Sequence, residues 1–145
     1  MTTAIRLIAL GRKISNLYAD LSAPLLREYG MNRTCFDVLM FCANLPEYNT
    51  ARDLCEMRGI KSGIASVAVE ALIAGGYLTR TPDAADRRKH RLVPTGKAAD
   101  LIQAGREMQA TFTDALRAGI TPEELHALER LTDTLEENLT RMGRG

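Results

Sequence analysis

The sequence predicts a mainly helical protein with a small two- or three-stranded antiparallel hairpin, an α+β fold. Apolar residues recur three and four positions apart over most of the 145 residues, which is the pattern of amphipathic helices. Residues 77–81 and 91–94 have strand-like composition and are separated by the polar residues 82–90, which indicates a hairpin. A chain of this length fits one domain that buries roughly two-thirds of its unfolded surface.

The first predicted helix covers residues 4–28 and ends at Gly30. Pro24 predicts a kink or a restart, with Ser22 as a possible cap. One apolar stripe runs along this helix, made up of Leu7, Leu10, Ile14, Leu17 and Leu21.

Asn32 is the predicted N-cap of a second helix that reaches about Leu45 and is closed by Pro46. Its inward face is expected to contain Phe36, Leu39, Met40 and Ala43.

A short helix, a turn with glycine and another helix follow, which is the helix-turn-helix pattern. Thr50 and Asp53 form a variant of the capping box at the start of the third helix, which runs to about Met57. Arg58-Gly59 makes the turn, and the fourth helix covers residues 61–74. Its predicted core residues are Ile60, Ile64, Ala68, Val69 and Leu72, which leaves Lys61, Ser62, Ser66, Val67 and Glu70 outward.

The hairpin carries most of the local positive charge of the chain. The formal net charge of the whole chain is +1, yet residues 80–97 contain six Lys or Arg and two Asp or Glu. Arg87, Arg88, Lys89 and Arg91 stand almost together, beside His90. A cationic surface this local is either a solvated loop or a contact for an anionic partner.

Two further helices are predicted after the hairpin. The fifth runs from Thr95 to about Ala118, with Leu101, Gly105, Met108, Phe112 and Ala115 on one face. Thr121, Pro122 and Glu124 supply the cap, first-turn proline and third-position carboxylate of a sixth helix. Its apolar stripe is Leu125, Leu128, Leu131, Leu135, Leu139 and Met142.

This ordered set of elements resembles the MarR (multiple antibiotic resistance regulator) family of winged helix-turn-helix transcription regulators. The resemblance rests on residues 50–55 (TARDLC), 60–67 (IKSGIASV) and 72–80 (LIAGGYLTR), and on Asp86-Arg87-Arg88, which matches the family's Asp-x-Arg. Pro94-Thr95 stands where the family has Leu-Thr, and Ala98 stands where it commonly has Gly. The resemblance implies one MarR-like domain over residues 1–145, with dimerisation helices at 1–30 and 98–145 and the winged helix-turn-helix at 32–97.

The resemblance and the residue chemistry together imply a double-stranded DNA partner with a pseudo-palindromic operator. Arg88 is the residue expected in the minor groove, while Arg87, Lys89 and His90 meet phosphates. Asp86 either orients Arg88 or ties the hairpin to the fourth helix. Lys61, Ser62 and Gly63 at the start of the fourth helix suit phosphate approach. Ser66 can bond a base edge, and the Val67 methyls can contact a thymine methyl.

The resemblance also implies a homodimer and a small effector. Leu7, Leu10, Ile14, Leu17, Leu128, Leu131 and Leu135 are the candidate interface residues. Small aromatic effectors of MarR-like repressors bind between the dimer helices and the winged helix. The candidate lining residues here are Tyr18, Phe36, Met40 and Met108, each of which also fits a plain core.

Two alternatives to a DNA-binding repressor stay open. The small, apolar fourth helix also fits a protein-interaction module or antagonist with weak DNA binding. Cys35, Cys42 and Cys55 leave room for a redox sensor, although buried free thiols are usually inert.

The sequence does not suggest an enzyme. No metal-ligand spacing, phosphate-binding loop or catalytic motif occurs, so we expect neither a cofactor nor a metal. No export or membrane signal is visible, and the chain is expected to be cytoplasmic.

Overall fold

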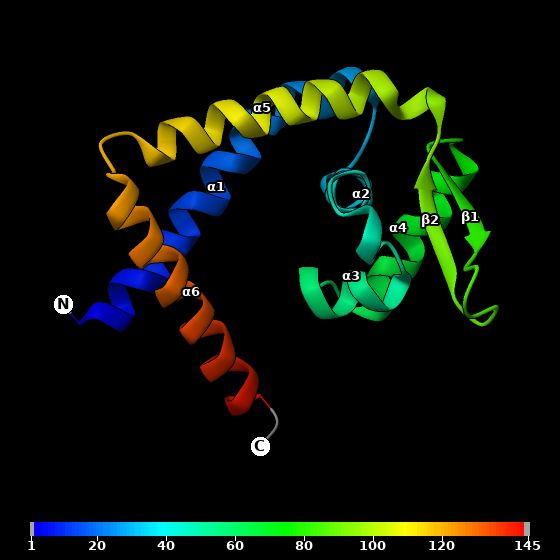
Figure 1. The fold of residues 1–145 in the computed structure, drawn as a ribbon. Coiled ribbons are helices and arrows are strands. Elements are labelled where there is room, and N and C mark those ends of the chain that lie inside the picture. Colours follow the sequence, from blue (N-terminus) through cyan, green and yellow to red (C-terminus); the bar gives the residue numbers. More distant parts are fainter. Residues whose placement is uncertain (1, 144–145) are drawn as a thin grey trace. The chain divides into compact units, whose positions relative to one another are not determined.

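The computed structural model describes residues 2–143, which fold as helices and one hairpin (Figure 1). The elements are α1 (Thr3–Tyr29), α2 (Arg33–Asn44), the 3₁₀ turn η1 (Pro46–Tyr48), α3 (Ala51–Arg58), α4 (Ser62–Ala74), β1 (Leu78–Pro82), β2 (His90–Pro94), the 3₁₀ turn η2 (Gly96–Ala98), α5 (Ala99–Arg117) and α6 (Pro122–Met142). The predicted fold class is confirmed. The chain divides into two compact units, one up to Phe112 and one from Thr113.

Local side-chain chemistry sets the helix ends, largely as predicted. The Asn32 side chain accepts a hydrogen bond from the Cys35 N–H at 2.8 Å and so caps α2. Thr50 and Asp53 form a reciprocal capping box on α3, and Thr121 and Glu124 form another on α6.

The predicted restart of the first helix at Pro24, capped by Ser22, was wrong. Helix α1 continues through Pro24 without interruption, and Ser22 is not a cap. Ser22 is buried, and its hydroxyl donates to the Ala19 carbonyl at 3.0 Å. A serine hydroxyl that donates to a carbonyl of its own helix has its hydrogen-bonding requirement met there and does not mark a helix start.

The first unit has a core to which α2 contributes the most side chains, including Phe36, Leu39 and Met40. The other buried residues come from α3, α4, both strands and the start of α5, and include Leu54, Val69, Leu72, Leu78, Leu92, Leu101 and Ile102. In Figure 1, α2, α3, α4 and the two strands lie together. This core is what holds the helix-turn-helix against the hairpin.

The inward face of α4 differs from the prediction at one position. Ala65 is buried, whereas Ile64 is 51% exposed. A helix face close to its neighbours admits the methyl group of Ala65, and the larger side chain points outward.

The hairpin has two strands paired antiparallel, from Leu78 opposite Pro94 to Pro82 opposite His90. No third strand occurs among residues 2–143, but Asn49 takes part of that role. The Leu92 N–H donates to the Asn49 carbonyl at 2.9 Å, and the Asn49 amide donates back to Leu92 at 3.0 Å. The segment between α2 and α3 is therefore fastened to β2.

Helix α5 begins later than predicted, because residues 96–98 form η2 instead of its first turn. Leu101, Ile102 and Gly105 are its buried residues, and Tyr18 of α1 meets Phe112 edge-on at 5.5 Å between ring centroids.

In the second unit, α6 has no fully buried residue. Within residues 2–143, none of the helices has the combination of length and apolar character that crossing a membrane requires.

Candidate nucleic-acid interface

Helix α4 follows the turn of the helix-turn-helix and exposes its first turn. Gly59 ends α3 with φ +72, a left-handed conformation that glycine adopts without steric cost. Lys61 stands at the N-cap position of α4 and makes no side-chain capping bond, and Ser62 and Gly63 are exposed. The positive end of the helix dipole is thus open to an anion.

The predicted base-contacting residues of α4 lie on its exposed side. Ser66 is exposed, and Val67 is 72% exposed. Glu70 on the same side pairs with Arg80 of β1 at 2.7 Å. This ion pair joins α4 to the hairpin and neutralises a carboxylate that would repel phosphate.

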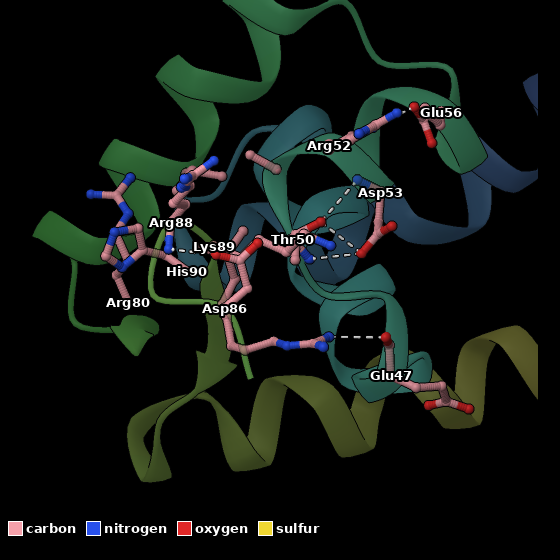
Figure 2. Close-up of a pocket in the computed structure, with 14 residues that line it drawn as sticks. Glu47, Thr50, Arg52, Asp53, Glu56, Arg80, Asp86, Arg88, Lys89 and His90 are labelled. Atoms are coloured by element: carbon pink, nitrogen blue, oxygen red, sulfur yellow. Dashed lines mark hydrogen bonds and ion pairs between the residues drawn. The ribbon is translucent and has the colours of Figure 1, made fainter. Parts of the chain in front are cut away.

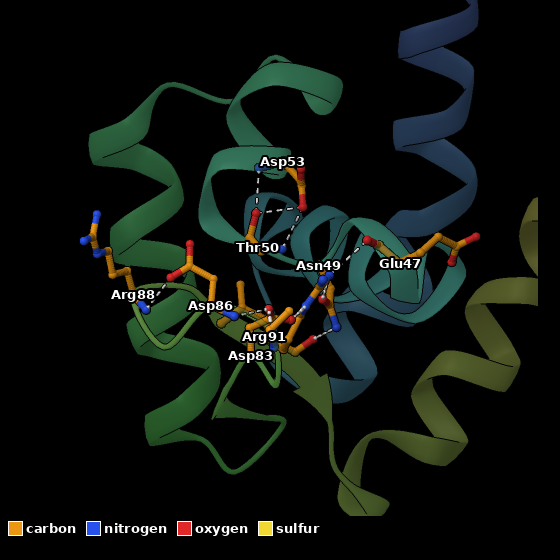
Figure 3. Close-up of polar contacts among 10 residues, drawn as sticks. Glu47, Asn49, Thr50, Asp53, Asp83, Asp86, Arg88 and Arg91 are labelled. Atoms are coloured by element: carbon orange, nitrogen blue, oxygen red, sulfur yellow. Dashed lines mark hydrogen bonds and ion pairs between the residues drawn. The ribbon is translucent and has the colours of Figure 1, made fainter.

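The tip of the hairpin, residues 83–89, is held by two aspartates. Asp83 accepts hydrogen bonds from the N–H groups of Ala85 and Asp86 at 3.1 and 2.9 Å. Asp86 accepts one from the Arg88 N–H at 3.0 Å (Figure 3). Asp86 therefore orients the Arg88 backbone, while the predicted role of orienting its side chain has no contact in this structure.

Three predicted cationic contacts and the neighbouring histidine have no partner within residues 2–143. The side chains of Arg87, Arg88, Lys89 and His90 are exposed and form no hydrogen bond or ion pair with the described residues. Figure 3 shows the Arg88 side chain extending away from the other labelled residues. Cations with no internal partner are available to an external anion.

Arg91, which the sequence groups with these cations, is engaged internally instead. Its Nε atom pairs with Asp83 Oδ1 at 2.9 Å, and Nη1 donates to the Glu47 carbonyl at 2.9 Å and to Asn49 Oδ1 at 3.2 Å (Figure 3). The bond from Arg91, followed by the backbone N–H bonds, holds the pKa of the Asp83 carboxyl below its usual value. Sequence reasoning missed this tether, because its partners lie 42 and 44 positions away.

A groove of about 670 Å³ lies between the hairpin and the start of α3. Figure 2 shows Arg80, Arg88, Lys89 and His90 on one side of it and Arg52 and Glu56 on the other. Arg52 forms an ion pair with Glu56 at 2.7 Å, and Asp53 takes part in the capping box of α3. The free positive charge of this groove therefore lies on its hairpin side.

The candidate effector residues do not form one cavity. Tyr18 and Met40 border a small cavity of about 180 Å³, together with Asp37, Arg58 and Gln109. Phe36 is fully buried in the core, and Met108 packs against the core. Burial raises the pKa of Asp37, against the opposing effect of Arg58 at 3.2 Å and Arg33 at 3.8 Å.

The candidate interface residues are mostly exposed in the single chain. Leu7, Leu10 and Leu17 are 46%, 52% and 57% exposed, and Ile14 is partly buried. On α6, Leu128, Leu131 and Leu135 are 51%, 61% and 44% exposed. Exposed apolar stripes of this length are typical of surfaces that another chain covers.

The helix-turn-helix with an adjoining cationic hairpin defines a winged helix-turn-helix protein. Comparisons with known proteins agree with this class: residues 29–89 match the model of the MarR family. The part of the chain that contains α2, the helix-turn-helix and most of the hairpin tip is thus similar to the MarR family of winged helix-turn-helix transcription regulators. Regulators of this family are not enzymes.

Solved structures share the fold at low sequence identity. A MarR protein from Peptoclostridium difficile DA00132 has 19% identity and a TM-score of 0.74, over 97% of this chain and 90% of that chain. The transcriptional regulator Tm0710 from Thermotoga maritima has 27% identity and a TM-score of 0.57, over 93% and 97%. The S. aureus MepR–DNA complex has 16% identity and a TM-score of 0.74, over 90% and 94%.

Proposed function

We propose that this chain is a dimeric regulator that binds duplex DNA at specific pseudo-palindromic sites. The observation that carries the proposal is the set of three exposed, internally unpaired cationic residues, Arg87–Lys89, with His90 beside them, next to a helix whose N-terminus is open. The match of residues 29–89 to the MarR family model supports it, and one structurally similar protein is described as bound to DNA.

The roles of the residues follow from their chemistry. Arg88 enters a narrow minor groove, where the negative potential is enhanced, and Arg87, Lys89 and His90 contact phosphates. Lys61, Ser62 and Gly63 bring the positive end of α4 to the backbone. Ser66 and Val67 then lie against base edges, and Asp86 keeps the hairpin tip in shape.

Residues 1–30 and 98–145 act as dimerisation helices of one MarR-like domain, and residues 32–97 bind DNA. A symmetric dimer sets two α4 helices about one DNA turn apart, ~34 Å. We further propose that the chain acts in the cytoplasm as a repressor that releases DNA when a small aromatic molecule binds. The cavity beside Tyr18 and Met40 supports an effector site.

A gel-shift assay with sheared genomic DNA at low and moderate salt tests the proposal. Phosphate contacts release counterions, so specific binding must weaken steeply as salt rises. Sequencing the retained fragments gives the operator. If no fragment is retained even at low salt, the chain does not bind DNA.

The second candidate function is a protein-interaction module or antagonist. Its support is the apolar side of α4, where Ile64 and Val67 are both more than half exposed. Absence of any DNA shift would favour this candidate.

A further inference from the structure

The outward side of α4 lacks the side chains that usually read bases by hydrogen bonds. From Ser62 to Ala74 it contains no Arg, Lys, Asn or Gln, so it cannot make the bidentate contacts to guanine or adenine. Glu70, the one ionisable residue of the helix, is taken by Arg80. The serine hydroxyls remain, but a hydroxyl can hydrogen-bond to any of the bases and so distinguishes them only weakly.

What α4 does present outward is methyl groups. Ile64 is 51% and Val67 is 72% exposed, three positions apart and so on one face of the helix. Gly63 and Ala71 on either side of them are exposed and small, so the Ile64 and Val67 side chains protrude from the helix surface.

These residues line a groove of about 290 Å³ between α4 and the start of α2. Asn32 and Thr34 also line this groove, and Asn32 Oδ1 is already used in capping α2. The Cys35 thiol donates to the Ala68 carbonyl at 3.8 Å. The groove therefore offers an apolar partner few free hydrogen-bonding groups and several methyls.

The surroundings of this groove favour DNA over an apolar protein segment as its occupant. Lys61 stands at the N-terminal end of α4, and the Glu70–Arg80 pair joins α4 to the hairpin that carries the free cations. An apolar strip flanked by cations matches a major groove, where base methyls lie between two phosphate backbones. Thymine is the base that offers such a methyl, at its C5 position.

We infer that Ile64 and Val67 form a methyl-reading pair that selects thymine by its C5 methyl group. The inference rests on the proposed DNA binding and specifies the sequence feature that the DNA must contain. It assigns sequence choice in the major groove to apolar contact, with the hairpin tip contributing affinity and groove-width preference.

The test uses the duplex recovered by selection from a random library, and its counterpart with deoxyuridine in place of thymidine inside each half-site. Uracil pairs as thymine does but lacks the methyl. Burial of one methyl predicts about a fourfold loss of affinity for each contacted position. The double variant Ile64→Ala, Val67→Ala should bind the two duplexes equally, and circular dichroism should show an intact fold because both side chains are exposed.

Arg88→Ala is the matched control. It should weaken binding to both duplexes and keep their ratio, because thymine and uracil present the same O2 acceptor in the minor groove. Equal binding of the thymidine and deoxyuridine duplexes by the wild type overturns the inference while DNA binding itself stands. A selected half-site without thymine also overturns it. If the wild type binds no duplex at all, the proposed function fails and this inference with it.

Discussion

At the scale of single residues, neighbouring cations of the hairpin have different tasks. The Arg91 guanidinium forms an ion pair with Asp83 and donates hydrogen bonds to Asn49 and the Glu47 carbonyl. These contacts tie β2 to the segment before α3. The four residues before it have exposed side chains with no partner among residues 2–143. The tether keeps the hairpin tip at a fixed position relative to α3, from which the free cations can act together.

Arg88→Ala and Lys89→Ala are expected to weaken DNA binding in different ways. Loss of Arg88 removes the side chain proposed for the minor groove, which should cost about 1–3 kcal/mol and reduce the preference for A·T-rich positions. Loss of Lys89 should weaken binding to all sequences alike and lower the salt slope by about one. Fluorescence anisotropy on specific and random duplexes at several salt concentrations separates the two. If Arg88→Ala binds both duplexes as tightly as the wild type does, the cationic hairpin tip is only a solvated loop.

The thiols of Cys35 and Cys42 are expected to be unreactive in the folded protein. Burial raises the pKa of Cys35 above its ordinary value and that of Cys42 from 9.0 to about 12. Because the raised pKa favours the neutral thiol, the stability from burying it is full below the unfolded pKa and falls as pH rises toward the folded pKa. Iodoacetamide at pH 8 followed by mass spectrometry should label Cys55, which is half-buried, before the other two. Rapid labelling of Cys35 or Cys42 without unfolding would revive a redox role.

At the scale of elements, the two glycines near the turn of the helix-turn-helix should respond oppositely to alanine. Gly59→Ala forces an L residue to φ +72 and should cost about 1 kcal/mol of unfolding free energy. Gly63 lies in the helix with no described atom within 4 Å of an added Cβ, so Gly63→Ala should be neutral or gain up to about 1 kcal/mol. Urea unfolding at a fixed chain concentration measures both. Equal effects would contradict the assigned turn geometry.

Local chemistry in the sequence was sufficient to predict most elements. The caps at Asn32, Thr50 and Thr121 are confirmed because the partner atoms lie three residues away. Ser22 has the same chemistry as a cap, yet the helix continues because packing of α1 outweighs the local signal.

Tertiary contacts decided what the sequence could not. Ile64 and Ala65 are adjacent apolar residues, and only the closeness of the neighbouring elements determines which is buried. Arg91 is distinguished from Arg88 by partners that fold back from residues 47 and 49. Charge clustering therefore predicted where the candidate interface lies but not which cations are free.

At the scale of the whole molecule, the exposed apolar stripes of α1 and α6 account for the proposed dimer. Leu17→Asp and Leu135→Arg place a charge on surfaces that a second chain would bury, at a cost of several kcal/mol if unpaired. Sedimentation velocity should show the wild type at twice the 16.0 kDa mass of one chain and both variants shifted to the monomer or unfolded.

Met57→Asp is the matched control for these two variants. Met57 is an exposed apolar residue of α3, 50% accessible and outside both stripes, so its replacement should leave the dimer intact. A stable dimer for both Leu17→Asp and Leu135→Arg would remove the stripes from the interface.

The most direct test of DNA binding by α4 and the hairpin tip is hydroxyl-radical footprinting on the selected operator. Two protected half-sites should appear with their centres about one DNA turn apart, ~34 Å, because a symmetric dimer presents two copies of α4. The Arg88→Ala variant should lose the minor-groove protection given by the hairpin tip and retain the protection around α4. A wild-type protein that protects no position, or a footprint that Arg88→Ala leaves unchanged, would contradict the account.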